Sequence, residues 1–430
     1  MSGPAEIVDG WLRAHWPSLP RSEPSIDAVP GCAVLAWAAS GGMALTGASD
    51  GAPDASPAPA FAVLEELAAQ LAITTGLTGT PVDLDAAGVI AWRAALRGLR
   101  RNGQVAAGGM TRLLPSADGW CAISLSRPDD VASVPALTEN AGTGDAWRDV
   151  AGYVRRTSSV AVVERAQMLG IASAHLPDVT GVPRAPLPFR VTRIADPTPI
   201  RLAGATVVDL SALWAGPLCG AVLHRAGAHV IKVESTDRPD GARVGDPDFF
   251  AWLHRGQEFR SIDFASSAGR EELARLLTGA DVVIEASRPR ALERLGVSPD
   301  QVPHPTGQIW VSITGGGRSR PMQIDFGDDA AVAGGLVGRS EGGPVFCADA
   351  IADPLTGAVA AIAVAASAYA GGGELIDVSM VDTARAFAAA GLDCPGEHHV
   401  TAEGSSWSAC CTTTGASVPV APPDPGRRPC

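Results

Sequence analysis

The sequence predicts an α/β fold in which a doubly wound, mostly parallel sheet forms a Rossmann-like large domain beside a smaller α+β domain. Three observations support this fold class. Short β-branched runs alternate with helical segments between residues 201 and 390. A glycine-bearing segment followed by a hairpin pattern occupies residues 100–126. Hydrophobic residues make up 46% of the 430 residues, which is enough for a large buried core.

The region from 201 to 390 reads as strand and helix in turn. The predicted strands are TVVDL (206–210), HVIKV (229–233), DVVIE (281–285) and QIWVSI (308–313). An amphipathic helix with Ser266 at its N-cap is expected over 266–280, and a buried helix over 355–370. Ligands of such a sheet bind at the carboxyl ends of its strands. The first turn, SALWAGPLCG, lacks the GxGxxG pattern, so a nicotinamide dinucleotide site is not expected.

The N-terminal part has a different pattern. We expect a Pro- and Ala-rich loop at 46–60, helices at 60–72 and near 86–100, and a hairpin turn at Asp118 and Gly119. Residues 40–53 parallel 333–344, and GTPVDLDAAGVIAWRAA (79–95) parallels GELIDVSMVDTARAFAA (373–389). These pairs indicate a degenerate repeat with the order Gly-Gly loop, Ala-rich helix, strand and Ala-rich helix. The segment 390–430 is rich in Gly, Ser, Thr and Pro and is predicted to be a loosely ordered tail.

Charge and composition exclude several classes of partner. The formal net charge is −13, and there is no run of Lys or Arg, so neither nucleic acid nor an anionic membrane is an expected partner. The start has no apolar signal region, and the apolar stretch 355–370 is too short to span a bilayer, so a cytoplasmic location is expected. The 8 cysteines are scattered without a CxxC pair, so we expect reduced thiols, no disulfide framework and no metal site.

Several motifs, in order along the chain, resemble family III CoA-transferases, which include formyl-CoA and carnitine CoA-transferases and α-methylacyl-CoA racemases. The segments that carry the resemblance are VVDLSALWAGPLCGAVLHRAGAHVIKVE (207–234), HRGQEFRSIDF (254–264), GREELARLLTGADVVIEASRPRALERLGV (269–297), VSITGGG (311–317), ADAIADPLTGAVAAIAVAASAY (348–369) and GGGELIDVSMVDTA (371–384).

The order of the halves departs from this family. Residues 1–195 resemble the latter half of one family copy, including the small domain, whereas 200–390 resemble the former half of a second copy and form the CoA-binding catalytic domain. The remaining 391–430 form the tail. The arrangement looks like a circular permutation or a truncated fusion. The resemblance also implies an interlocked homodimer.

The resemblance assigns the chemistry to Asp353. This residue precedes Pro354 at the start of an alanine-rich helix, where an N-cap role is also compatible. By resemblance its carboxylate is the covalent nucleophile. Asp349 is the nearest rival, and Asp328 and Asp329 are more distant ones. Gly108 and Gly109 match the family's glycine loop, whose N–H groups would stabilise an oxyanion.

The CoA-binding residues are also assigned by resemblance. Arg288 and Arg294 match arginines of the CoA-binding loop, with Ala291 and Leu295 lining the same pocket. Arg243 and Arg255 are weaker candidates. The sequence departs from the family at three positions: Gln257 stands in place of the usual lysine, Thr236 in place of an arginine, and Trp214 in place of the Gln of formyl-CoA transferase.

The implied activity is the movement of CoA between carboxylic acids through aspartyl-anhydride and aspartyl-CoA thioester intermediates, with CoA as a substrate and no metal. The alternatives are an acyl-CoA racemase or isomerase of the same superfamily, or a catalytically degenerate CoA-binding protein. Racemases place a His before an Asp upstream of the catalytic segment, and Gly327 precedes Asp328 here. The sequence does not specify the donor and acceptor acids.

Overall fold

A computed structural model describes residues 3–21, 31–140, 142–178, 187–391 and 394–430 of the protein. Its centre is a seven-stranded sheet with the strand order β4-β12-β9-β8-β5-β6-β7. These strands are β4 (Phe189–Arg193), β5 (Thr206–Asp209), β6 (His229–Ser235), β7 (Glu258–Ile262), β8 (Val282–Glu285), β9 (Ile309–Thr314) and β12 (Glu374–Ser379). All neighbouring pairs are parallel except β4 and β12, which confirms the predicted doubly wound fold.

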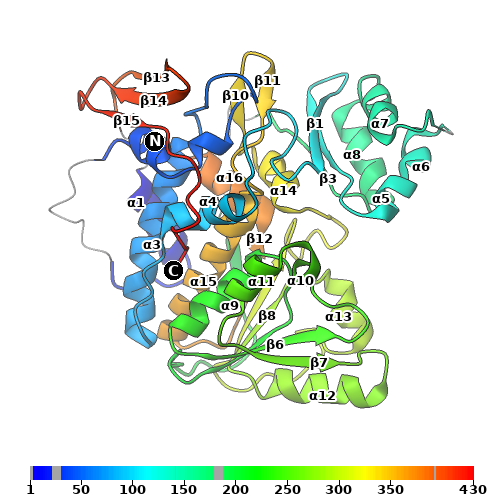
Figure 1. Cartoon of the computed structure of the whole chain (residues 1–430). Helices are drawn as coiled ribbons and strands as arrows, with labels where there is room; N and C mark the ends of the chain where they lie inside the picture. Colours follow the sequence, from blue (N-terminus) through cyan, green and yellow to red (C-terminus); the bar gives the residue numbers. More distant parts are fainter. Residues whose placement is uncertain (1–2, 22–30, 141, 179–186, 392–393) are drawn as a thin grey trace.

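Helices cover both faces of this sheet, as the alternating sequence pattern requires. One face packs against α9 (Ala215–Arg225), α15 (Ala352–Ala370) and α16 (Met380–Ala388), where alternate strand residues such as Val207 and Ile309 join the largest apolar cluster. The other face contributes Val208 and Trp310 to a second cluster with α12 (Ser267–Thr278) and α13 (Pro289–Leu295). Figure 1 shows α9 and α12 on opposite sides of the strands.

The small domain is formed by the later part of the N-terminal half of the chain. Its sheet is β1 (Thr111–Pro115), β2 (Trp120–Ser124) and β3 (Ser173–His175), with the predicted turn at 118–119. Its helices are α5 (Pro128–Ala132), α6 (Val134–Thr138), α7 (Ala146–Val154) and α8 (Ser159–Met168). The domain packs through Ala106 and Leu113 onto Val332 of α14 (Gly327–Gly334) and onto Phe346.

The N-terminal segment shares the core of the large domain. Its elements are α1 (Pro4–Arg13), α2 (Ala33–Ala39), the short η1 (Met43–Leu45), α3 (Ala58–Thr78) and α4 (Ala86–Leu96), and their apolar side chains join the cluster around α15. Figure 1 shows α3 beside α15. The strand expected at 82–84 is wrong, because this segment is irregular. Of the strand and helix expected over 79–95, only the helix, α4, forms. The remaining elements are α10 (Ala242–Gly245), α11 (Pro247–Leu253), β10 (Gly338–Ser340) and β11 (Gly343–Val345).

Two helices, α3 and α15, are long and apolar enough to cross a membrane by length and composition alone. The most apolar window of α15 is 89% buried within the protein, and that of α3 is 56% buried. The two helices pack against each other, so the apolar surface of α15 is explained by its place in the core.

The loosely ordered tail expected at 390–430 is wrong for the residues that the structure describes. The chain forms a three-stranded antiparallel sheet from β13 (His398–Glu403), β14 (Ser406–Cys411) and β15 (Ser417–Pro419). It then runs along the N-terminal segment, where Asp85 N–H donates to the carbonyl of Pro429 over 2.7 Å and Arg427 pairs with Asp85 at 2.6 Å. Backbone pairing and these contacts fix a segment whose composition suggests flexibility.

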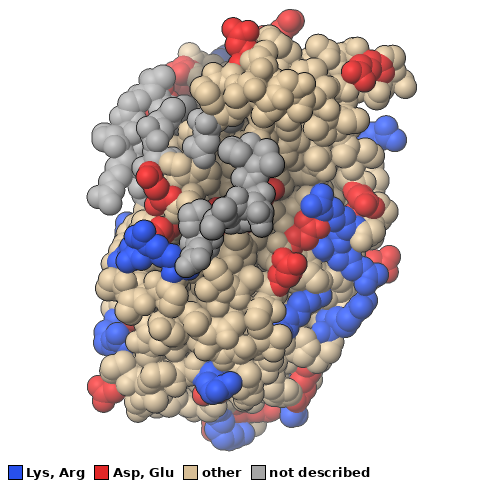
Figure 2. Space-filling view, turned by 90° about the vertical axis from the view of Figure 1, so that its left-hand side faces the viewer, with Lys and Arg blue, Asp and Glu red and all other residues tan. Residues whose placement is uncertain are grey.

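Charged side chains of both signs lie close together on the surface. On the face shown in Figure 2, basic side chains gather toward one edge with acidic side chains among them. Arg427 and Asp85, for example, form a surface ion pair with side chains 47% and 28% exposed.

Candidate functional site

The candidate site lies where the segment after β5 approaches the first turns of α15. The strand order reverses between β5 and β8, since β6 and β7 lie on one side and β9 and β12 on the other. This is the switch point at which doubly wound sheets bind ligands. Gly357 permits α15 to approach this point, because a Cβ there would lie 2.6 Å from the carbonyl oxygen of Ala215.

Asp353 lies in the first turn of α15. The helix begins at Ala352 with Ile351 as its N-cap, so the N-cap role expected for Asp353 is wrong by two positions. Burial raises the pKa of Asp353 to about 7, against the positive charge of Arg93, and the backbone of Gly327 donates a hydrogen bond that also opposes the rise. Burial therefore disfavours the ionised form of Asp353 overall, and Arg93 and the Gly327 N–H offset part of this effect.

Arg93 is a site residue that sequence reasoning missed. It comes from α4, far away in the sequence, and its Nη1 donates to Asp349 Oδ2 over 2.7 Å while its Nε lies 3.4 Å from Asp246 Oδ2. Its guanidinium carbon lies 5.1 Å from the centroid of the Trp214 ring. These carboxylates raise the pKa of Arg93 although burial opposes its charge, so the cation remains next to Asp353.

The rival acid Asp349 is engaged in this ion pair, and its side chain is only 2% exposed. Burial raises its pKa, with Arg93 opposing the rise. Its neighbours Ala348 and Ala350 both have positive φ values, 52° and 45°. Such conformations cost energy in residues other than glycine and cluster at functional sites. The loop that leads into α15 therefore holds Asp349 against Arg93.

A second carboxyl group faces the site from α14. Burial raises the pKa of Asp328 to about 8, and the negative charges of Asp349, Asp329 and Asp353 add to the effect. Its Oδ1 accepts a hydrogen bond from Ala350 N–H at 3.2 Å. The preceding residue is Gly327, at which a Cβ would lie 2.5 Å from Asp353 Oδ2. The absence of a side chain at Gly327 allows the nucleophile candidate to reach its position.

Asp329 connects the small domain to this region. Ser124 Oγ, at the end of β2, donates to the two carboxylate oxygens of Asp329 at 3.0 and 2.9 Å. Gln167 of α8 makes two further bonds, to the carbonyl oxygen and the N–H of Ile324. Contact of the small domain with the helix that carries Gly327 is therefore made within one chain. Both carboxylate oxygens of Asp329 accept from Ser124, so this residue holds the small domain against α14, whereas Asp353 faces the candidate site.

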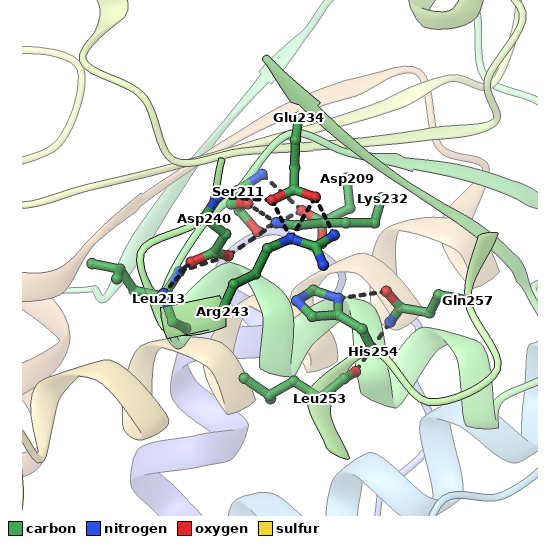
Figure 3. Close-up of polar contacts among 11 residues, drawn as sticks. Asp209, Ser211, Leu213, Lys232, Glu234, Asp240, Arg243, Leu253, His254 and Gln257 are labelled. Carbon is green, nitrogen blue, oxygen red and sulfur yellow. Dashed lines mark hydrogen bonds and ion pairs between the residues drawn. The ribbon is translucent and has the colours of Figure 1, made fainter. Parts of the chain in front are cut away.

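A buried network holds the loop that carries Trp214 (Figure 3). Lys232, fully buried on β6, lies 3.3 Å from Asp240 Oδ2 and donates to the carbonyl of Ser211. Asp240 in turn accepts from Leu213 N–H at 3.1 and 3.2 Å. Leu213 has a φ of 70°, which is unfavourable for its side chain. The ion pair thus stabilises the bend that turns Trp214 toward Arg93.

The predicted glycine loop lies at the surface of the small domain. Gly108 and Gly109 are exposed, and Gly109 has a φ of 81° that favours glycine. Ala106, at the base of this loop, packs with Val332 and Phe346, on the side of the small domain that meets α14. A Cβ at either glycine would meet no atom of the described structure within 4 Å, so no close approach within the protein requires them.

The predicted CoA residues lie on and beside α13, which follows β8. Arg288 is the N-cap, Ala291 and Arg294 are exposed, and Leu295 is half-buried. Burial lowers the pKa of Arg288, and the positive charges of Arg290, Arg127 and Arg238 add to the effect. Arg127 belongs to the small domain, and neither it nor Arg238 was assigned a binding role from the sequence.

Arg243 and Arg255, the weaker candidates for CoA binding, lie outside α13. Arg243 is paired with Glu234, with its Nη2 2.5 Å from Oε2 (Figure 3). Its guanidinium carbon also lies 4.3 Å from the centroid of the Phe250 ring. Arg255 is exposed after α11. Gln257, which replaces the lysine of the family pattern, accepts a hydrogen bond through its Oε1 from His254 Nδ1 at 2.7 Å in a buried pair. Arg243 is therefore bound to a structural partner, whereas Arg288 faces other cations.

Comparisons with known proteins match the second half of the chain. Residues 202–404 match the model of CoA-transferase family III. An acyl-CoA transferase of Fusarium pseudograminearum is 30% identical over 207 residues, covering 42% of this chain and 45% of the relative. A succinate–glutarate CoA-transferase of Agrobacterium fabrum is 31% identical over 205 residues, covering 42% of this chain and 51% of the relative. The chain spans about half the length of these curated relatives.

Among solved structures, a CaiB/BaiF family protein from Brucella suis is 29% identical, with a TM-score of 0.39, and the match covers 44% of this chain and 55% of that one. Asp353, Arg288 and Trp214 lie inside the matched region, and Arg93, Gly108 and Gly109 lie outside it.

Proposed function

We propose that this protein moves CoA from an acyl-CoA donor to a carboxylic acid acceptor with Asp353 as the covalent nucleophile, because residues 202–404 match the model of CoA-transferase family III. One observation carries the proposal. The carboxylate of Asp353 lies in the first turn of α15 with a pKa of about 7, supported by Arg93 and by the backbone of Gly327. A helix N-terminus and a cation both favour the ionised form that attacks a thioester.

The chemistry follows from one carboxylate that carries CoA. An Asp353 oxygen attacks the thioester carbonyl carbon, and the C–S bond breaks to give an aspartyl-acyl anhydride and CoA thiolate. The thiolate then attacks the aspartyl carbonyl carbon, which releases the donor carboxylate and leaves an aspartyl-CoA thioester. The acceptor carboxylate attacks this thioester to form a new anhydride and thiolate. The thiolate attacks the acceptor acyl carbon and frees Asp353, so no proton or electron is gained or lost.

The phosphate groups of CoA would bind near Arg288. Half-buried guanidinium groups that repel one another are stabilised when an anion arrives between them, and arginine matches the geometry of phosphate. Arg127 and Arg238 add charge from the small domain and from the turn after β6. A CoA molecule held there would bridge the two domains at the carboxyl end of β8, beside the loop that carries Trp214. The exposed Gly108 and Gly109 would then supply N–H groups to the oxyanion of the tetrahedral intermediates.

The experiment is to incubate the protein with a panel of acyl-CoA thioesters, including succinyl-CoA, and to measure the intact mass. A stable mass increase by CoA, removed by hydroxylamine and mapped to the peptide with Asp353, supports the proposal. Asp353→Asn should show no increase, while Asp248→Asn, an exposed acid in the first turn of α11, should react like the wild type. Covalent attachment at another residue would contradict it. CoA binding without attachment would instead favour a degenerate CoA-binding protein.

A separate test distinguishes transfer from racemisation. Racemisation needs two groups that exchange the α-proton of the acyl chain. Gly327 has no side chain that could exchange a proton, and a side chain at this position would collide with Asp353. We therefore expect no deuterium at Cα of a 2-methylacyl-CoA incubated in heavy water. Deuterium incorporation that is lost in Asp328→Asn would show the racemase alternative to be right.

A further inference from the structure

Three thiols and one imidazole converge where the C-terminal sheet meets α2, outside the residues that surround Asp353. The side chains are those of Cys32, Cys394, His398 and Cys411, and their ligand atoms all lie within 4.8 Å of one another. Cys32 Sγ lies 3.0 Å from His398 Nε2, and Cys394 Sγ lies 3.5 Å from Cys411 Sγ. Cys32 and Cys411 are 4% and 2% exposed. The other five cysteines of the chain do not belong to this group.

We propose that Cys32, Cys394, His398 and Cys411 bind one structural Zn²⁺ ion. Thiolate and imidazole are the ligands that zinc prefers, and the set of three Cys and one His is a common structural zinc site. Ligand atoms about 2.3 Å from a tetrahedral ion lie about 3.7 Å from one another. The spacings of 3.0 and 3.5 Å, within a group no wider than 4.8 Å, match this size. Four protein ligands leave no position for water, which indicates a structural role.

The local fold brings the ligands together. His398 opens β13 and faces Cys411, the last residue of β14, in the antiparallel register, so the two side chains are cross-strand neighbours. Cys394 precedes His398 by one tight turn. Gly396 within that turn lies so close to the next segment that a Cβ would be 2.9 Å from Thr413 N. The turn therefore folds back onto the end of the hairpin and directs Cys394 at Cys411.

The fourth ligand comes from the other end of the sequence. Cys32 is the N-cap of α2, and α2 packs on β14 and β15. Backbone contact continues beyond the cluster, where Ala421 N–H donates to the carbonyl of Ala38 over 2.9 Å. A zinc ion held by Cys32 and the hairpin would thus join the two ends of the chain. Spacing along the sequence led to the expectation of no metal site, because this set has no CxxC pair and one ligand lies far from the rest.

The chemistry of binding requires that three thiols lose their protons and that His398 is neutral. A disulfide between Cys394 and Cys411 would use two of the four groups and leave His398 and Cys32 without a role.

The test is the zinc content of the full-length protein, purified with a reductant and without chelator or affinity metal. We expect about one zinc per chain by elemental analysis. Matched neighbours provide the controls. His398→Ala and Cys411→Ser should lose the zinc and melt at a lower temperature, whereas His399→Ala and Cys410→Ser, which stand next to the ligands, should keep it.

Cobalt keeps the test decisive if a ligand variant does not fold. Wild-type protein stripped of metal and titrated with Co²⁺ should show the absorption of a tetrahedral ion with thiolate ligands, and excess Zn²⁺ should bleach it. Less than about one tenth of a zinc per chain together with no such Co²⁺ spectrum would overturn the proposal. Equal zinc loss in the His399 and His398 variants, or a Cys394–Cys411 disulfide in freshly reduced protein, would also overturn it.

Discussion

The two halves of the chain share one hydrophobic core but contribute to the candidate site in different ways. Residues 202–404 supply Asp353, Gly327 and Trp214 from the turns that follow strands and begin helices. The N-terminal part supplies Arg93 from the last turn of α4, and it does so through a tertiary contact with Asp349. The nucleophile candidate is thus encoded in a local motif, whereas the charge that sets its ionisation comes from a distant helix.

The largest effect is expected from the proposed nucleophile, Asp353. Asp353→Asn should lower transfer by at least about a thousandfold, because no neighbour can replace a covalent carrier. The fold should be nearly unchanged, since Asn has the same size and removes a buried charge. The change in unfolding free energy should stay within about 1 kcal/mol. Steady-state transfer and chemical denaturation measure the two quantities. Activity within tenfold of the wild type would locate the chemistry outside the matched half.

The next effect tests the N-terminal half. Arg93→Gln leaves Asp349 buried without its cation, and breaking a buried pair in this way costs about 3 kcal/mol. Activity should also fall about tenfold at pH 7, because the pKa of Asp353 rises when the opposing charge is lost. Urea unfolding and transfer assays check both.

Arg97→Gln is the matched control, one turn further along the chain. Its side chain is 38% exposed and its Nε lies 4.0 Å from Asp246, so the substitution should change stability by less than about 0.5 kcal/mol. Equal losses in the Arg93 and Arg97 variants would show that the N-terminal half acts on the site only as scaffold.

A smaller effect should separate binding from chemistry. Arg288→Gln should raise the KM for the CoA thioester about tenfold with little change in kcat, because phosphates far from the reacting carbon are bound equally in the ground and transition states. Arg275→Gln, exposed in the last turn of α12, is the control for loss of one positive charge. A fall in kcat with KM unchanged would mean that Arg288 is not a CoA ligand.

The sequence predicted the sheet well because its strands are short buried runs separated by capped helices. Val207 and Val283 lie on β5 and β8 as expected, and Ser266 caps α12 through the N–H of Gly269. The tail was mispredicted because β13–β15 is held by hairpin pairing and contacts with α2, which composition does not reveal.

The site was predicted only in part for the same reason. Asp353 and Arg288 lie in linear motifs that can be read from the sequence. Arg93 cannot be found in this way, because its role depends on α4 packing beside α11 and α15. No pattern within GVIAWRAAL distinguishes it from a solvated arginine. The interlocked homodimer remains a prediction for sedimentation, although the small domain already meets α14 within one chain through Ser124 and Asp329.

The smallest effect is the pH dependence of the transfer rate. It connects the two halves of the chain, because Asp353 lies in one half and the opposing charge of Arg93 in the other. In the proposed mechanism only ionised Asp353 attacks a thioester, and burial raises its pKa to about 7, so the rate should rise with pH. A single group of this pKa is about one tenth ionised at pH 6, half at pH 7 and nine tenths at pH 8. The rate should therefore increase about fivefold from pH 6 to 7 and less than twofold from pH 7 to 8.

Arg93→Gln should move this rise to higher pH, because it removes the positive charge that opposes protonation of Asp353. Asp349→Asn should move it to lower pH, because it removes a negative charge that favours protonation. Profiles of kcat/KM for the three proteins provide the measurement. If both variants moved the profile in the same direction, the titrating group would not be Asp353, and the charge supplied by the N-terminal half would have no part in the chemistry.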